Sequence, residues 1–169
     1  QARAVRLAAM MAKDEKYTAK EIVACVQQLV DRTTAYFIVD DLNNLQRGGR
    51  LSAGAALVGS MLKIKPILTF EDKKIVALEK IRTQQKAMKR IEQLFEEDTQ
   101  TTDGDGYELV IIHANAPEAG EAWRAQIQEK YPKLRTSLAY FGPVIGTHLG
   151  QGALGCSWDI VLEKNLEKI

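Results

Sequence analysis

The chain has 169 residues, and its 23 lysines and arginines nearly balance its 22 aspartates and glutamates, leaving a formal net charge of +1. This balance provides no basic surface for nucleic acid or an anionic membrane, so we expect no nucleic-acid role. No apolar run approaches the roughly 20 residues that span a bilayer, so we expect a protein that is not inserted in a membrane. Cys25 and Cys156 lie in apolar runs without a C-x-x-C spacing, which is typical of reduced thiols in a cytoplasmic protein.

Two amphipathic helices are predicted at the start of the chain, over residues 1–12 and 18–32. In the second helix, Thr18 and Glu21 have the spacing of a capping box. The chain opens without a capping residue or an initiator methionine, so we expect these helices to derive from a longer protein. Their apolar faces should then be partly exposed unless a missing domain or a second copy covers them.

A strand is predicted over 35–39, and Asp40 and Asp41 follow it. Adjacent carboxylates do not share one helix face, so we interpret an aspartate here as the N-cap of the short helix that follows, rather than as part of an acid/base pair. Gly48 and Gly49 should end that helix, one of them in the left-handed conformation.

Arg50 stands between this glycine pair and a helix that Ser52 is expected to cap. A guanidinium in that position can bind a carboxylate through two hydrogen bonds, beside a helix N-terminus. The structural alternative is a salt bridge to Asp40 or Asp41.

The helix predicted over 53–62 is rich in alanine and glycine, so another part of the molecule can approach it closely. Core packing is the ordinary explanation. The functional alternative is an acyl tail lying against four of its apolar residues, which are Leu57, Val58, Met61 and Leu62.

A hairpin is predicted from 64–70 and 74–77, and an amphipathic helix over 83–97. The next strand, 109–112, delivers His113 at its carboxyl end, the edge of an α/β sheet that ligands favour. His113 therefore either contacts a ligand or holds the neighbouring turn by a hydrogen bond. A helix from Pro117 to Tyr131 follows.

The segment 141–155 is a glycine-rich loop that carries the second histidine, His148, beside the Thr147 hydroxyl. We expect no helix here, and backbone N–H groups that can turn toward a carboxylate or phosphate. Residues 150–155 match G-x-G-x-x-G, but the strand predicted after them is not the context of a dinucleotide site. With two histidines and no spaced cysteine pair, we expect no metal site.

Four blocks of sequence, in this order, resemble the DegV family of bacterial fatty-acid-binding proteins. They are Leu42-x-x-Leu45-x-x-Gly48-Gly49-Arg50, Ile64-Lys65-Pro66-Ile67-Leu68, His113-Ala114-Asn115-Ala116 and Gly142-Pro143-Val144-Ile145-Gly146-Thr147-His148. The family's His-Thr-Gly-Pro-Gly run reads His148-Leu149-Gly150-Gln151-Gly152 here.

The resemblance implies an α/β fold, with a mixed β-sheet flanked by helices, that forms the C-terminal domain of a two-domain protein. Residues 1–32 would be helices left from the front domain or linker, and 33–169 the DegV-like domain. Such a protein is a cytoplasmic carrier without catalysis or a cofactor: it buries a long-chain fatty acid and presents the carboxylate to a fatty acid kinase.

On this hypothesis the head group meets Arg50, Gly146, Thr147, His148 and Gly150, with His113 as a secondary candidate, and the tail meets the apolar residues of 57–62. Two alternatives remain open. One is an acyl or phosphoryl hydrolase or transferase that uses His148. The other is a ligand-free dimerisation or partner-binding domain.

Overall fold

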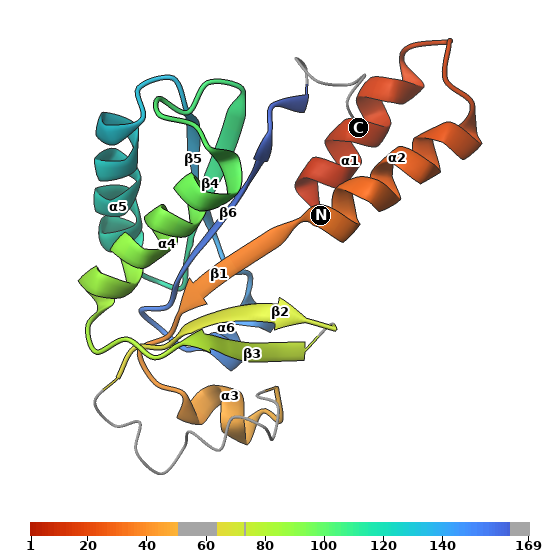
Figure 1. Cartoon of the computed structure of the whole chain (residues 1–169). Helices are drawn as coiled ribbons and strands as arrows, with labels where there is room; N and C mark the ends of the chain where they lie inside the picture. Colours follow the sequence, from red (N-terminus) through yellow and green to blue (C-terminus); the bar gives the residue numbers. More distant parts are fainter. Residues whose placement is uncertain (51–63, 73, 163–169) are drawn as a thin grey trace. The chain divides into compact units, whose positions relative to one another are not determined.

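The structure is a computed structural model that describes residues 1–50, 64–72 and 74–162. Its contacts divide the chain into two compact units: one comprises Gln1–Thr33 and the residues from Ile160 onward, and the other comprises Thr34–Asp159. Figure 1 shows the elements of both units along the chain.

The first unit is built on two helices, α1 (Ala2–Ala12) and α2 (Ala19–Arg32). The predicted capping box of α2 is confirmed: the Thr18 N–H donates to Glu21 Oε2 at 2.7 Å and the Glu21 N–H donates to Thr18 Oγ1 at 3.3 Å. The apolar faces of the helices bury one small cluster. Its fully buried members are Leu7, Met11, Leu29 and Leu162. Other apolar side chains on these helices stay exposed within the described part of the unit, namely Val5, Val23 and Val30.

The second unit contains a six-stranded mixed sheet with the strand order β3-β2-β1-β6-β4-β5. β1 pairs antiparallel with β2 and β6, β2 pairs antiparallel with β3, and β4 pairs parallel with β5. Together with the helices around it, this sheet confirms the predicted α/β class. The strands are β1 (Thr34–Ile38), β2 (Ile67–Glu71), β3 (Lys74–Glu79), β4 (Tyr107–His113), β5 (Arg135–Tyr140) and β6 (Leu154–Ile160).

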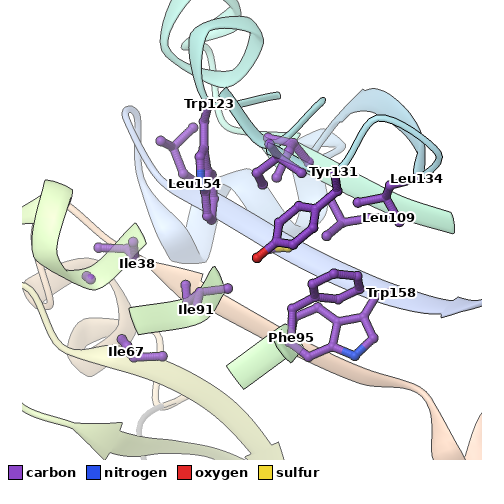
Figure 2. Packing of buried hydrophobic residues seen from close by; sticks show 14 residues of the cluster. Ile38, Ile67, Ile91, Phe95, Leu109, Trp123, Tyr131, Leu134, Leu154 and Trp158 are labelled. Carbon is purple, nitrogen blue, oxygen red and sulfur yellow. The ribbon is translucent and has the colours of Figure 1, made fainter. Parts of the chain in front are cut away.

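One face of the sheet packs against α4 (Gln84–Thr99) and α5 (Pro117–Lys130), which form the main core with it. Figure 2 shows aromatic side chains crowding this core, where the rings of Phe95 and Trp158 meet edge to face with centroids 5.5 Å apart. Two of these aromatic side chains donate hydrogen bonds to carboxylates in the last turns of α4. The Trp158 indole N–H donates to Asp98 Oδ2, and the Tyr131 hydroxyl donates to Glu96 Oε1, both at 2.7 Å. These bonds satisfy groups that would otherwise be costly to bury.

The opposite face carries a smaller cluster with α3 (Asn43–Arg47) and α6 (Pro143–Leu149). Side chains alternate along a strand, so Ile38 belongs to the main core while Phe37 and Val39 belong to this second cluster. The second cluster therefore lies on the sheet face next to α3 and α6. The carboxyl end of β4, where the sequence predicts a ligand site, adjoins the same cluster through Ala114.

One local prediction at the start of α3 needs correction, and one at its end is confirmed. The residue in the cap position of α3 is Leu42, not an aspartate, and Asp41 acts from one position earlier, where its Oδ1 accepts from the Asn43 N–H at 2.8 Å. Asp40 does not cap either, because its carboxylate pairs with Lys65 Nζ at 2.7 Å. Gly49 has φ +62°, which confirms the left-handed residue predicted after the helix.

The expectation of a helix-free loop over 141–155 is wrong, because α6 occupies Pro143–Leu149. Proline at the first helical position has a φ suited to a helix and needs no N–H partner there. The Thr147 hydroxyl further donates to the Pro143 carbonyl at 2.7 Å. In the sequence, the surrounding glycines obscured this short helix.

Candidate functional site

A cavity of about 340 Å³ lies within the second unit, on the α3 and α6 side of the sheet. Its lining is mostly apolar and comes from the strands β1, β2, β3, β4 and β6, from α6, and from Arg50 and Phe141, which follow α3 and β5. The lining residues are Ala35, Tyr36, Phe37, Arg50, Phe70, Ile75, Ile112, Phe141, Val144, Ile145, His148, Leu149, Gly155 and Cys156.

Strand register explains how distant parts of the chain share this cavity. Phe37 of β1 is aligned with Gly155 of β6, and Phe70 of β2 is aligned with Ile75 of β3. Aligned residues on neighbouring strands point to the same face, so their side chains line one space. At Gly155 the absent side chain leaves room for the ring of Phe141, whose Cζ lies 2.8 Å from where a Cβ would stand.

Two predicted head-group residues, Arg50 and His148, both line the cavity and are its basic side chains. Arg50 directly follows the left-handed Gly49, and its N–H donates to the Leu45 carbonyl at 3.0 Å. Within residues 1–50, 64–72 and 74–162, its guanidinium has no ion-pair partner, so the salt bridge considered with Asp40 or Asp41 does not form there. Arg50 is exposed and His148 is half-buried.

His148 is placed by close packing between α6 and the end of α3. A Cβ at Gly48 would lie 2.5 Å from His148 Nδ1 and 3.2 Å from its Cε1. The first distance is too short for a real contact and the second is a tight one, so the imidazole occupies the space that a larger residue at position 48 would fill. Gly48 has φ −76°, so it is the packing and not the backbone angle that requires glycine.

The other three predicted head-group residues are absent from the lining, and their polar groups have partners in the chain. The Gly146 N–H donates to Gly142 O and the Gly150 N–H donates to Gly146 O, both at 2.8 Å. The Thr147 hydroxyl is hydrogen-bonded to Pro143 O.

The glycines around residue 150 are explained by side chains that approach them. A Cβ at Gly150 would collide with the Asn44 amide, and one at Gly152 would collide with the Asp40 carboxylate. Both glycines also have positive φ, +79° and +85°. The structure thus accounts for them by chain packing, without an anion.

His113 lies at the carboxyl end of β4, as predicted, but does not line the cavity. Its Nδ1 accepts a hydrogen bond from the Ala116 N–H at 3.3 Å, so in the neutral ring the proton resides on Nε2. This bond is the turn-holding role considered from the sequence. The predicted tail-lining residues Leu57, Val58, Met61 and Leu62 lie outside the described residues.

Sequence reasoning missed most of the apolar wall, including Phe37, Phe70, Ile112, Phe141 and Gly155. The alternation in β1 was a usable signal, since Ala35 and Phe37 share one face. Cys156 also borders the cavity, but its side chain belongs to the main core on the other face of the sheet, where burial raises the pKa of its thiol well above the ordinary value of 9.0. It is therefore held as a neutral thiol rather than as a nucleophilic thiolate.

No helix in 1–50, 64–72 or 74–162 has the length and apolar character required to cross a membrane. In the same part of the chain, no three histidine, cysteine or acidic residues gather in a way that could hold a metal ion.

The sheet and its helices define an α/β domain with an apolar cavity that two basic side chains border. The family model described as "Uncharacterised protein, DegV family" matches residues 1–160. The chain belongs to the DegV family.

Curated relatives agree. A DegV domain-containing protein of Listeria innocua is 50% identical over 157 residues, covering 93% of this chain and 54% of that protein. Protein DegV of Bacillus subtilis is 45% identical over 151 residues, covering 89% of this chain and 53% of that protein. The chain spans about half the length of these relatives.

Solved structures share the fold. The crystal structure of DegV, a fatty acid binding protein from Bacillus subtilis, matches with a TM-score of 0.82 and 42% identity, covering 95% of this chain and 56% of that one. A fatty acid binding DegV family protein from Streptococcus agalactiae matches with a TM-score of 0.76 and 37% identity, covering 92% and 54%.

Proposed function

We propose that this protein binds a long-chain fatty acid, with the acyl tail in the apolar cavity and the carboxylate against Arg50 and His148. The observation that carries the proposal is this combination: an apolar lining with two basic side chains from separate segments. A fatty acid has the same division, an apolar chain with one anionic end.

Burial of the acyl tail would supply most of the binding free energy, and the hydrogen bonds to the head group would fix the orientation of the ligand. Each buried methylene contributes about 0.8 kcal/mol, so a long acyl chain offsets an association cost of about 4–15 kcal/mol. Arg50 can bind both carboxylate oxygens through parallel N–H donors, and His148 can donate in either protonation state. Gly146, Thr147 and Gly150 are not needed as donors in this arrangement.

The similar structures support the ligand class, since two with 42% and 37% identity are described as fatty acid binding proteins. Because this chain spans about half of each of them, we propose that a longer protein of the family completes the enclosure of the tail.

We further propose that the protein acts as a carrier, presenting the bound carboxylate to a fatty acid kinase in the bacterial cytoplasm. Arg50 supports this role, because it is exposed and would hold the carboxylate where a partner can reach it. In this role the protein itself is not catalytic, because the kinase makes the acyl phosphate.

The experiment is solvent extraction of the purified protein followed by mass spectrometry, on the chain described here and on one extended to the length of its relatives. The test variant is Arg50→Ala with His148→Ala. The matched control is Arg47→Ala, which removes an exposed arginine of α3 that does not line the cavity.

We expect near-stoichiometric fatty acid in the parent and in the Arg47→Ala control, and much less in the double variant. Lipid-free preparations at both chain lengths would contradict fatty-acid binding. Adding a purified fatty acid kinase and ATP should then yield acyl phosphate only when the carrier is loaded. Its formation from free fatty acid without the carrier would contradict the presenting role.

A further inference from the structure

The two sides of the cavity differ in how exposed their lining residues are, and this difference bears on which fatty acids the cavity accepts. Toward β2 and α6 its lining is open, with Phe70, Val144 and Ile145 each more than half exposed. Toward β6 its lining is buried, at Gly155 and Cys156. A chain that enters from the exposed side therefore travels across the strands toward β6 and β4.

At that inner side the ring of Phe141 stands directly over Gly155. Its Cζ lies 2.8 Å and its Cε2 3.5 Å from the position of a Cβ at residue 155. The ring therefore occupies the space that the side chain of any residue other than glycine at position 155 would fill.

The backbone of Phe141 is fixed from two directions. Its N–H donates to the His113 carbonyl at the end of β4, at 2.9 Å. The next residues, Gly142 and Pro143, begin α6. The half-buried ring also packs against the cluster that includes Phe37 and Leu149. A ring held this way is a wall rather than a mobile side chain.

We propose that Phe141, seated over Gly155, sets the length of acyl chain that this protein accepts. The inference rests on the proposed function, because it assigns a specificity-determining residue to the same cavity. Methylenes that reach the ring find no further space, so chains beyond that length gain no affinity from them.

The test is a series of affinities for straight-chain saturated fatty acids of increasing length, measured on the purified protein. Each methylene that enters the cavity should raise the affinity about fourfold, and the rise should stop where the chain meets the ring. The length at which the rise stops is the readout, since a general loss of apolar contact lowers every affinity without moving it.

Phe141→Ala and the milder Phe141→Leu should move the stopping length to longer chains, Phe141→Ala further. Gly155→Ala should move it to shorter chains, because the new methyl group drives the ring into the cavity. Phe70→Ala is the control: it removes a phenylalanine at the exposed side and should lower all affinities with the same stopping length.

An unchanged stopping length in folded Phe141→Leu and Gly155→Ala proteins that still bind fatty acid would overturn this inference and leave the proposed function intact. Absence of binding at every length in the parent would instead overturn the proposed function, and this inference with it. Thermal unfolding of each variant identifies any that fails to fold.

Discussion

Replacing Gly48 by alanine should separate ligand binding from stability. The added Cβ would lie 2.5 Å from His148 Nδ1 and 3.1 Å from the Asn44 carbonyl. The carbonyl belongs to a helix and cannot move far, whereas the imidazole is half-buried and can rotate. We therefore expect the substitution to displace His148 and leave α3 in place.

The size of both effects follows from the same geometry. Gly48 already has φ −76°, so alanine fits its backbone, and the smaller entropy of the unfolded chain contributes about 0.4–1 kcal/mol of stability. This gain roughly offsets the cost of the remaining close contact, so the free energy of unfolding should change little. Loss of a hydrogen bond to a charged carboxylate costs about 1.5–3 kcal/mol, so affinity should fall tenfold or more.

Gly49→Ala is the matched control on the neighbouring residue. A Cβ there meets nothing within 4 Å, but φ is +62°, so alanine is strained by about 1–2 kcal/mol. We expect this variant to lose stability and keep its affinity, the reverse of Gly48→Ala. The assays are thermal unfolding and titration with a fatty acid. Parental affinity in folded Gly48→Ala would refute the placement of His148 at the head group.

Three further predictions concern the rest of the chain. Thr18→Ala removes the capping box of α2 and should cost about 1 kcal/mol in denaturant unfolding, whereas Thr18→Ser should not; an equal loss in both would contradict the capping role. Burial and the raised pKa of Cys156 should keep it unreactive to iodoacetamide in the folded protein while the half-buried Cys25 reacts faster, and rapid native labelling of Cys156 would contradict this. The Tyr131 hydroxyl, followed by Lys130, holds the pKa of Glu96 below its ordinary value of 4.5, so this bond contributes stability above that pH and loses it as pH falls through the lowered pKa. Tyr131→Phe should accordingly be about 1 kcal/mol less stable near pH 7, with a difference from the parent that shrinks in acid; a difference independent of pH would refute the pairing.

The sequence predicts the regular elements well because local rules set them. Thr18 and Glu21 mark the start of α2, and the hairpin of β2 and β3 follows from two apolar runs around a polar turn. It predicts α6 poorly, because glycines at 142, 146 and 150 suggest a loop, while the proline at 143 and the threonine bond that support a helix are single local signals.

The residues of the site also differ in how well the sequence predicts them. Arg50 and His148 stand out in the sequence through residue type and flanking glycines, and both line the cavity. The wall does not stand out, because the alignment of Phe37 with Gly155 depends on pairing between segments more than a hundred residues apart. The role of Gly48 is invisible for the same reason, since its neighbour His148 lies on another element.

A crystal structure of the protein with a long-chain fatty acid tests the central claim most directly. We expect the carboxylate within hydrogen-bond distance of the Arg50 guanidinium and a His148 ring nitrogen, and the tail between Phe37 and α6 with its end toward Phe141. A fatty acid bound elsewhere, or with its carboxylate away from both basic side chains, would contradict the account.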